Sequence, residues 1–322
     1  MSLRVAVQMD PLENINIAGD SSFALMLSAQ ARGHELWHYD VTSLAYESDG
    51  TLHGRITAHA APVTVQREAG NHFSAGERRR IDLAQDIDVI LMRQDPPFHL
   101  GYISAALLLD RLKGKTLVAN DPREVVNAPE KMFVLDYAQY MPPTLVARHV
   151  DDLRAFQKKH GSVVVKPLHG NGGKAIFRID ESGTNLSALS EVFDQTWPEP
   201  HMVQPFLPEV SEGDKRIVLV DGEFAGAINR FPGEGEFRSN LAQGGHAEAT
   251  ELTAREEEIC AAMGPELKRR GLVFVGIDVI GGKWLTEINV TSPTGIVAID
   301  RFNGTDTAAL IWDAIERRHA AM

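Results

Sequence analysis

The stretch Phe274–Val290 reads FVGIDVIGGKWLTEINV, two apolar runs separated by Gly281–Lys283. Alternating runs on either side of a glycine-containing turn are typical of a β-hairpin. Glu287 and Asn289 are two positions apart, so they share one face of their strand. Asp278 is expected to join that face if the turn has two or four residues, but not if it has three.

Two carboxylates and an amide oxygen on one face form a site of hard oxygen donors. Such donors suit Mg²⁺, with phosphate oxygens as further ligands. The alternative is a polar, solvated sheet face, which is normal for antiparallel sheets. The run Thr286–Gly295, TEINVTSPTG, is rich in small hydroxyl residues after the strand, and this favours a ligand-facing end.

A second stretch, Val163–Lys174, reads VVVKPLHGNGGK. It predicts a buried strand that ends in Lys166, followed by a glycine loop and another strand. Glycines let the backbone approach a phosphate closely and aim N–H groups at it. The spacing is not that of a P-loop, and no helix follows. The pattern predicts a flap over a nucleotide, with a plain hairpin turn as the alternative.

A third group of candidate functional residues is basic. Arg216 stands at the start of a predicted strand, Arg230 ends one, and Arg238 lies in the glycine-rich loop Phe231–Gly245. Arginine forks bind carboxylate or phosphate with two parallel hydrogen bonds. Each of these residues taken singly, and Lys131 likewise, is more typical of a solvated surface.

The composition limits the classes of function. The chain has 322 residues, 43% of them apolar, and a formal net charge of -12. This charge argues against nucleic-acid or membrane-surface partners. Cys260 is the only cysteine and no export signal is visible, so a cytoplasmic location and a buried structural thiol are expected.

Strand and helix signals alternate through the first third of the chain, which predicts an α/β domain with a parallel sheet. No G-x-G-x-x-G follows the first strand, and this disfavours a nicotinamide oxidoreductase. Turn signals near Asp121 and Pro200 predict three domains, with bounds 1–121, 122–200 and 201–322. The last part is rich in strands, so the chain is α+β overall.

Together these motifs resemble the ATP-grasp superfamily and, within it, the bacterial glutathione synthetases. The resemblance extends over almost the whole sequence. Three motifs carry most of it: DSSF at 20–23, DPPF at 95–98 and TEINVTSPT at 286–294. It implies an ATP-grasp fold in which a doubly wound domain precedes a small lid and a catalytic domain. It also implies the ligation of γ-glutamylcysteine to glycine through an acyl phosphate, with ATP as co-substrate and Mg²⁺, or Mn²⁺, as the metal.

The resemblance also implies roles for particular residues. Arg216 and Arg238 would be catalytic, and Asp278, Glu287 and Asn289 would bind the metal. The peptide and glycine carboxylates would be held by Arg230, Asn240, Ser292, Thr294 and Gly295. ATP would be bound by Lys131, Lys166, Gly170, Asn171, Gly172, Gly173, Gln204, Phe206, Leu207 and Asp214. The family further implies a homo-oligomer, a dimer or a tetramer.

Two alternatives remain at this point. Another ATP-grasp ligase would share the ATP half and differ in the segments Asp20–Ala24 and Arg93–Phe98. A non-catalytic ATP-binding protein of the same fold could lose Arg216 and the three metal-binding residues freely, and their presence speaks against it.

Overall fold

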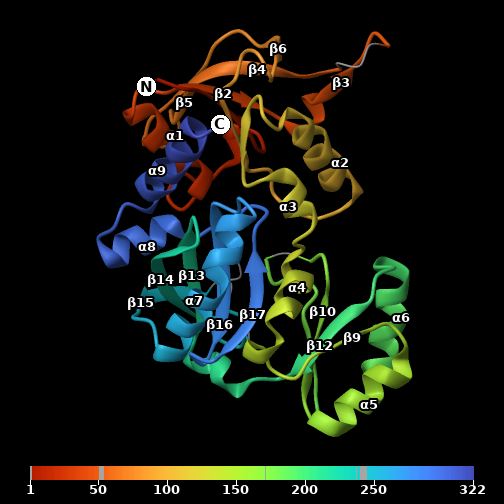
Figure 1. The fold of residues 1–322 in the computed structure, drawn as a ribbon. Coiled ribbons are helices and arrows are strands. Elements are labelled where there is room, and N and C mark those ends of the chain that lie inside the picture. The colour runs from red at the N-terminus through yellow and green to blue at the C-terminus, as the bar shows by residue number, and fades with distance from the viewer. Residues whose placement is uncertain (1, 51–53, 171, 237, 240–244) are drawn as a thin grey trace.

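The computed structural model describes residues 2–50, 54–170, 172–236, 238–239 and 245–322. Within this part of the chain the strands form three separate sheets. Figure 1 shows the N-terminal sheet at the top, the C-terminal sheet below it, and the sheet of the middle segment beside the C-terminal one.

The N-terminal sheet has the strand order β3-β4-β2-β1-β7-β8, and β5 and β6 also pair with β4. Strands β2, β1, β7 and β8 are parallel, and the strands around β4 are antiparallel. The alternation in Thr51–Gln66 suggests a β-hairpin within this stretch, but its residues 55–65 form one long strand, β4, which pairs with β3, β5 and β6. Residues 51–53 lie outside the described residues. The bounds are β1 Arg4–Gln8, β2 Glu35–Tyr39, β3 Ala45–Glu47, β4 Arg55–Val65, β5 Phe73–Ala75, β6 Arg79–Asp82, β7 Val89–Met92 and β8 Leu117–Ala119.

Helices cover both faces of this sheet. Helices α1 (Ser21–Ala31) and α9 (Thr307–Ala320) share a core with Val5 and Val7 of β1. Helix α2 (Leu100–Leu109) packs on the opposite face, in the core that contains Ala6. The prediction of a doubly wound α/β domain is therefore confirmed, and the C-terminal helix α9 completes it.

Both ends of helix α1 are stabilised by local interactions. The carboxylate of Asp20 accepts a hydrogen bond from the Phe23 backbone N–H, at 2.6 Å, and so caps the first turn. Gly33 follows the end of the helix with a φ of 80°, in the left-handed region that favours glycine.

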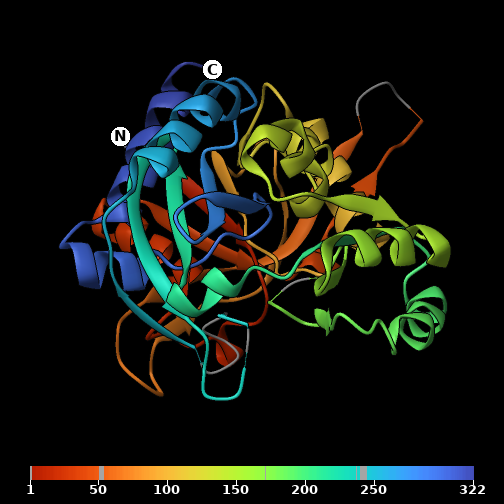
Figure 2. The same cartoon turned by 90° about the horizontal axis from the view of Figure 1, so that it is seen from below.

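The middle segment forms an antiparallel sheet in the order β11-β10-β12-β9. Helices α5 and α6 cover one face, on a core that includes Val163, Val165 and Phe193. Figure 2, from below, shows these two helices at the outer edge of the molecule, in yellow-green and green. The bounds are β9 Leu145–Ala147, β10 Val163–Pro167, β11 Phe177–Ile179, β12 His201–Pro205, α5 Val150–His160 and α6 Leu186–Thr196.

The C-terminal sheet is antiparallel in the order β15-β14-β13-β16-β17. Helix α7 (Ala254–Arg269) covers one face with Ile259, Met263 and Leu267, which share a core with Ile217 and Ile277. Cys260 lies in this helix, buried as predicted. The bounds are β13 Asp214–Val220, β14 Glu223–Phe231, β15 His246–Ala249, β16 Phe274–Ile280 and β17 Trp284–Asn289.

One expectation about the β16–β17 hairpin is wrong. The turn between Ile280 and Trp284 has three residues, which was expected to keep Asp278 off the face of Glu287. Asp278 nevertheless pairs directly with Glu287, because the register shifts between Asp278 and Val279. A β-bulge places one extra residue, Thr286, in β17, and so restores the shared face.

Among the α-helices and strands, the sequence patterns did not predict β3, β5, β6, α6, β15 and α8 (Ile296–Asn303). Short helical segments complete the described chain: α3 Pro122–Val126, α4 Glu130–Phe133, η1 Leu12–Asn14, η2 Val41–Ser43, η3 Asp110–Leu112, η4 Val134–Tyr140 and η5 Pro208–Glu212. Among the described residues no helix combines the length and apolarity that a membrane crossing needs.

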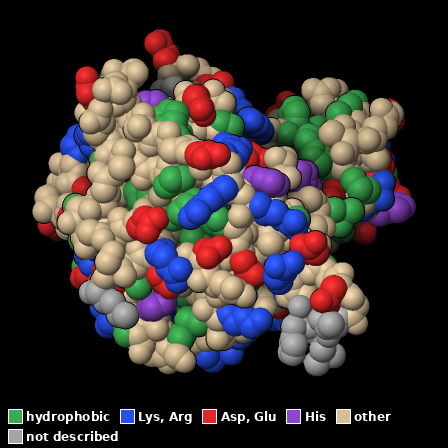
Figure 3. All heavy atoms as spheres, turned by 90° about the horizontal axis from the view of Figure 1, so that it is seen from above, with side chains coloured by type: hydrophobic (Ala, Val, Ile, Leu, Met, Phe, Trp, Pro, Cys, Tyr) green, Lys and Arg blue, Asp and Glu red, His purple; other side chains and the backbone are tan. Residues whose placement is uncertain are grey.

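Charged side chains of both signs are interspersed on the face of the N-terminal domain seen in Figure 3. On this domain Glu47 of β3 forms ion pairs with Arg55 at 3.5 Å and with Arg80 at 2.9 Å. These exposed pairs contribute little stability.

Candidate active site

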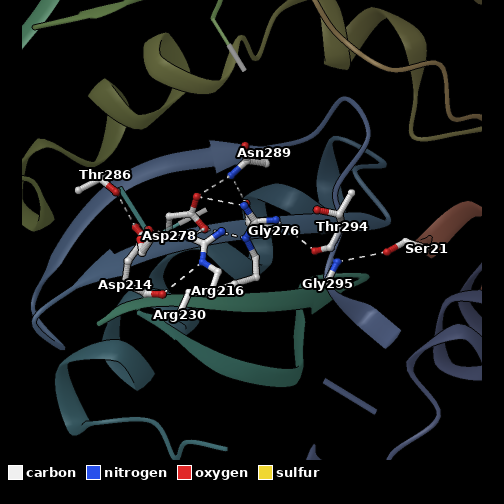
Figure 4. Close-up of polar contacts among 11 residues, drawn as sticks. Ser21, Asp214, Arg216, Arg230, Gly276, Asp278, Thr286, Asn289, Thr294 and Gly295 are labelled. Atoms are coloured by element: carbon white, nitrogen blue, oxygen red, sulfur yellow. Dashed lines mark hydrogen bonds and ion pairs between the residues drawn. The ribbon is translucent and has the colours of Figure 1, made fainter. Parts of the chain in front are cut away.

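One face of the C-terminal sheet gathers most of the predicted catalytic and metal-binding residues. Arg216 on β13 pairs across the sheet with Asp278 on β16, and Asp278 pairs with Glu287 on β17. The guanidinium of Arg216 donates two hydrogen bonds to the Asp278 carboxylate, from Nε to Oδ1 at 2.6 Å and from Nη2 to Oδ2 at 3.1 Å (Figure 4). Asn289 lies beside them and donates from Nδ2 to the carbonyl of Gly276 at 3.3 Å.

Asp278 is buried within a network of positive charge. Arg230 on β14 also reaches it, with Nη2 at 3.0 Å from Oδ1. Burial acts to raise the pKa of Asp278, but Arg216 and Arg230 outweigh it and hold this pKa well below its usual range. The carboxylate is therefore ionised throughout the neutral range.

Two lysines face this sheet from other elements. Lys131 on α4 is buried and lies with Nζ 3.4 Å from Glu287 and 2.9 Å from the carbonyl of Gly170. Burial acts to lower the pKa of Lys131, but Glu287 and Glu130 raise it overall. Lys166, at the end of β10, is buried too, and burial lowers its pKa although Glu287 opposes this. Both amines therefore lie close enough to Glu287, a predicted metal ligand, for its charge to act on their pKa values.

A cavity lies between the sheet of the middle segment and this face, and residues of both line it. The predicted ATP-binding residues that line it are Lys166, Gly173, Gln204, Phe206, Leu207 and Asp214. Arg238, Asp278 and Glu287 line it as well. The structure thus brings phosphate-binding and metal-binding candidates to one cavity.

The glycine loop lies between β10 and β11, which pair antiparallel as expected of a flap. Gly172 and Gly173 have φ of 62° and 73°, in the left-handed region where glycine is favoured. Gly170 contacts Lys131 as described above. Asn171 lies outside the described residues.

Two of the predicted ATP-binding residues, Gln204 and Phe206, make hydrogen bonds within the protein. Gln204 donates from Nε2 to the Oγ1 of Thr144 at 3.0 Å, and the Phe206 N–H donates to the Ser162 carbonyl at 2.8 Å. The guanidinium of Arg178 lies 3.8 Å from the centroid of the Phe206 ring. These contacts fix this wall of the cavity, and its contact with ATP stays a prediction.

Asp214 carries an unused acceptor at the cavity. Its Oδ2 pairs with Arg230 at 2.7 Å and accepts from the Oγ of Ser239 at 2.8 Å. Its Oδ1 is buried and has no hydrogen-bond partner among the described residues. An orphaned buried carboxylate oxygen is costly unless a donor satisfies it. A ligand hydroxyl, such as that of a ribose, would do so.

The donor set fits a hard divalent cation that phosphate oxygens help to hold. Glu287 lines the cavity, and Asn289 uses Nδ2 for Gly276 and Asp278, which leaves its Oδ1 as an acceptor. Asp278 lies opposite Glu287, although its oxygens are engaged by the two arginines. The described residues hold no cluster of three His, Cys, Asp or Glu arranged for a metal, so further ligands would come from the nucleotide.

The turn Ser292–Gly295 connects this face to the N-terminal domain. Arg216 donates from Nη1 to the Thr294 carbonyl at 3.1 Å, and the Gly295 N–H donates to the Oγ of Ser21 at 3.2 Å (Figure 4). Ser292 donates to the Arg93 carbonyl at 3.3 Å. The predicted substrate-binding turn is thus held from both sides.

The glycine-rich loop after β14 contacts the glycine loop of the lid. Arg238 donates from Nη1 to the Gly173 carbonyl at 3.2 Å and pairs with Glu236 at 2.9 Å. Asn240, and with it the predicted contact to a carboxylate, lies outside the described residues, as do Phe237 and residues 241–244. Arg230 lies in the buried network with Asp214 and Asp278, and its contact with substrate stays a prediction.

Sequence reasoning missed several residues of the cavity wall. Val164, Ile176 and Ile280 line the cavity opposite and beside the polar groups. The period-two alternation of β10 could have identified Val164, because Val163 and Val165 lie in the lid core and Lys166 faces the cavity. No local signal identifies the contacts of Arg93 and Ser21 with the turn Ser292–Gly295, since these residues lie about 200 or more positions away in the chain.

Comparison with known families accounts for nearly the whole chain. Residues 3–125 match the family described as prokaryotic glutathione synthetase, N-terminal domain. Residues 130–304 match prokaryotic glutathione synthetase, ATP-grasp domain. The chain belongs to the prokaryotic glutathione synthetase family.

The similarity to members of this family covers almost the whole chain. The chain is 53% identical over 320 residues to a glutathione synthetase of Rhodopseudomonas palustris, covering 99% of this chain and 100% of the relative. It is 54% identical over 320 residues to a glutathione synthetase of Bradyrhizobium diazoefficiens, with the same coverage.

Solved structures show the same fold at low identity. The D-cycloserine synthetase DcsG superposes with a TM-score of 0.68 at 17% identity, covering 98% of this chain and 99% of that one. A RimK domain protein ATP-grasp from Sphaerobacter thermophilus gives 0.64 at 19% identity, covering 97% and 98%. The ATP-grasp fold expected from the sequence is therefore confirmed.

Proposed function

We propose that this chain joins γ-glutamylcysteine to glycine at the expense of ATP, which makes it a glutathione synthetase. The observation that carries the proposal is the convergence of Arg216, Asp278 and Glu287 on one sheet face with Lys131 and Lys166 opposite. A site that brings a carboxylate to a triphosphate must offset strong anionic repulsion, and this arrangement concentrates the charges that do so.

The first step transfers the γ-phosphoryl group of ATP to the cysteinyl carboxylate. A bond forms between a carboxylate oxygen and phosphorus, and the bond to the ADP oxygen breaks. Lys131 and Lys166 hold phosphate oxygens, and Arg216 faces both the γ-phosphate and the incoming carboxylate. Positioning and charge neutralisation carry such a step without a protein nucleophile. When bound to Asp278, Glu287 and Asn289, Mg²⁺ (or Mn²⁺) supplies further neutralisation at the phosphates.

The second step is attack of the glycine nitrogen on the acyl phosphate. A C–N bond forms, phosphate leaves with the electrons of the C–O bond, and the nitrogen loses a proton. The acyl phosphate must be kept from water, and the loop that carries Arg238 lies against the glycine loop at the Gly173 carbonyl. Arg230, Asn240 and the turn Ser292–Gly295 hold the substrate carboxylates in this proposal.

We also propose a division of labour among three domains. Residues 1–121 receive the peptide, 122–200 form the lid over ATP, and 201–322 carry the catalytic face. The separate sheets of the three segments support this division. A cytoplasmic location and a homo-oligomeric state, dimer or tetramer, complete the proposal. Light scattering coupled to size exclusion measures the oligomeric state.

A substrate panel tests the proposed reaction. Purified protein is incubated with ATP, Mg²⁺ and pairs of carboxylates and amines, and ADP release and the product mass are measured. ADP release that needs both γ-glutamylcysteine and glycine, with a product of the mass of glutathione, is expected. Turnover of another pair would make the chain a different ATP-grasp ligase, and ATP binding without turnover of any pair would make it a binding protein. Replacing Mg²⁺ by Mn²⁺ or Ca²⁺ in the same assay identifies the metal.

A further inference from the structure

The second step of the proposed reaction needs a proton acceptor that the mechanism above leaves unnamed. The nitrogen of glycine, attacking as the free amine, gains a positive charge as the C–N bond forms, and it must then lose a proton. Enzymes commonly assist such a transfer with a side chain whose pKa lies near the working pH. The carboxylates on or beside the C-terminal sheet face are the first candidates: Glu130, Asp214, Asp278 and Glu287.

Three of these carboxylates are committed to other partners. Asp278 is held by Arg216 and Arg230, and these two cations keep its pKa well below its usual range. Such a carboxylate is a weak base. Glu287 is a predicted metal ligand. Asp214 pairs with Arg230 at 2.7 Å and is a predicted contact of ATP. Glu130 remains as the candidate without an assigned role.

Glu130 keeps one carboxylate oxygen available. It begins α4, which lies beside β17 (Figure 1). Its Oε1 accepts a hydrogen bond from the Oγ1 of Thr291 at 3.2 Å. Its Oε2 lies 4.0 Å from the Nζ of Lys131, beyond hydrogen-bonding distance, and accepts no hydrogen bond from another described residue. The side chain is 14% exposed, so a small ligand can reach it.

Glu130 also lies between the residues that are proposed to hold the two reactants of this step. On one side, Lys131 is a predicted phosphate-binding residue and lies 3.4 Å from Glu287. On the other side, Thr291 directly precedes the turn Ser292–Gly295, which is proposed to hold substrate carboxylates. Glycine is no longer than one residue of extended chain, roughly 3.5 Å. A glycine held at this turn by its carboxylate can therefore bring its nitrogen to Glu130.

The surroundings of Glu130 make its carboxylate a stronger base than an exposed one. Burial raises the pKa of Glu130 to about 7, and the charge of Glu287 acts in the same direction. The cations Lys131 and Arg216 oppose this rise in pKa without cancelling it. Tyr102 also lies near Glu130, but burial raises the pKa of its phenol, so it stays neutral. Protonation of the Glu130 carboxylate relieves its desolvation, which favours proton transfer to it.

We propose that Glu130 is the general base of the second step and accepts the proton that the glycine nitrogen loses on attack. The C–N bond forms, the C–O bond to phosphate breaks, and the proton passes from nitrogen to Oε2 of Glu130. Phosphate leaves with the electrons of the broken bond, and Glu130 returns its proton to solvent when the products leave. The assignment rests on the proposed function, because the proton belongs to the amine of that ligation.

The choice of nucleophile separates a base from a structural role. Hydroxylamine captures acyl phosphates without a general base, because its nitrogen is unprotonated at neutral pH and unusually nucleophilic. The wild type and Glu130→Gln are assayed with ATP, Mg²⁺ and γ-glutamylcysteine, with either glycine or hydroxylamine as the acceptor, and peptide and hydroxamate are measured by mass spectrometry. In Glu130→Gln we expect kcat with glycine to fall by at least about 10²-fold, while hydroxamate formation stays within about 3-fold of the wild type.

A second measurement and a matched control accompany this assay. Positional isotope exchange in ATP labelled with ¹⁸O reports reversible acyl phosphate formation without glycine, and it decides the matter if hydroxylamine is not captured even by the wild type. This exchange is expected to stay within about 3-fold of the wild type in Glu130→Gln. Glu257→Gln, exposed on α7, is the control and should leave every rate unchanged.

Each outcome bears on the assignment. Equal losses in the first step and in glycine ligation would mean that Glu130 only positions Lys131 or Thr291, and ligation within about 3-fold of the wild type would assign the proton to another acceptor. Either result overturns the proposal. Should Glu130→Gln fail to fold, Glu130→Asp decides, because it keeps the charge but withdraws the carboxylate by one methylene. It should lower glycine ligation by about 10-fold and hydroxamate formation by no more than about 3-fold.

Failure of the proposed function gives a different result. A wild type that forms neither peptide nor hydroxamate from γ-glutamylcysteine, and shows no isotope exchange with it, would overturn the proposed function and the role of Glu130 with it. A wild type that ligates glycine, together with a Glu130→Gln enzyme that ligates it equally well, would overturn the general base alone.

Discussion

Arg216 holds Asp278 by two parallel hydrogen bonds, at 2.6 and 3.1 Å, although both side chains are almost wholly buried. A buried ion pair of this kind is weak evidence for stability, because desolvation offsets much of the attraction. The pair lies between Glu287 and the turn Ser292–Gly295, which we propose to be part of the reaction centre.

Replacing Arg216 by Met should therefore affect activity and stability in separable ways. We expect turnover to fall by at least about 10²-fold, because a charge that faces the transferred phosphoryl group is lost. We also expect a loss of about 3 kcal/mol in the free energy of unfolding near neutral pH, since Asp278 keeps only Arg230 as an ion-pair partner. The double variant Arg216→Met/Asp278→Asn should recover stability in urea unfolding but not turnover. Recovery of turnover in the double variant would assign the pair a structural role alone.

Glu287→Gln or Asn289→Ala should weaken Mg²⁺-dependent turnover by at least about 10²-fold while the fold is retained. The assay is ADP release over a Mg²⁺ titration, with circular dichroism as the check on folding. Glu223→Gln on β14, exposed and on the same sheet, is the matched control and should leave the titration unchanged. Full activity in both site variants would show that Glu287 and Asn289 are not the metal ligands.

The raised pKa of Glu130 should make the free energy of unfolding of the ligand-free protein depend on pH. Burial, opposed by Lys131 and assisted by Glu287, raises the pKa of Glu130 from 4.5 to about 7. Between these values the folded state holds a proton that the unfolded state has lost, so stability falls as pH rises and levels off above about 7. Glu130→Gln should remove a decline on the order of 3 kcal/mol. Urea unfolding at pH 5, 6, 7 and 8 measures this decline. If the free energy of unfolding changes with pH in the same way in the wild type and in Glu130→Gln, the prediction is contradicted.

The loop Phe231–Gly245 is predicted to close over the intermediate when the peptide binds. Arg238→Ala removes the contact with the Gly173 carbonyl. We expect a higher KM for γ-glutamylcysteine and hydrolysis of ATP without peptide formation, because water reaches the acyl phosphate. The ratio of ADP to peptide product measures this uncoupling. Arg301→Ala, exposed on α8, serves as the control and should couple normally.

Limited proteolysis tests the closure independently. Cleavage within Phe231–Gly245 should be suppressed by ATP together with the peptide, because an ordered loop resists proteases. Equal cleavage with and without ligands, combined with normal coupling in Arg238→Ala, would reduce the segment to a connector.

Periodicity and turn chemistry predicted most of the elements. The strand that ends in Lys166, the glycine loop after it and the hairpin within Phe274–Val290 follow from short-range patterns, which depend on neighbouring residues only. Helix α8 and strand β15 were missed. Strand β15 is short and exposed, and α8 follows a glycine with a φ of 108° without any capping side chain, so neither carries a strong local signal.

The sequence by itself determined which candidate residues for ATP and metal binding stand together: Lys166 before a glycine loop, and Asp278, Glu287 and Asn289 in one hairpin. Tertiary structure decided how they are arranged. The bulge at Thr286 places Asp278 opposite Glu287, which turn length alone predicted wrongly. Arg93 and Ser21 reach the turn Ser292–Gly295 only because α1 and β7 pack beside the C-terminal sheet. Such contacts depend on register and on the packing of distant segments, and these are set by the whole core rather than by any local pattern.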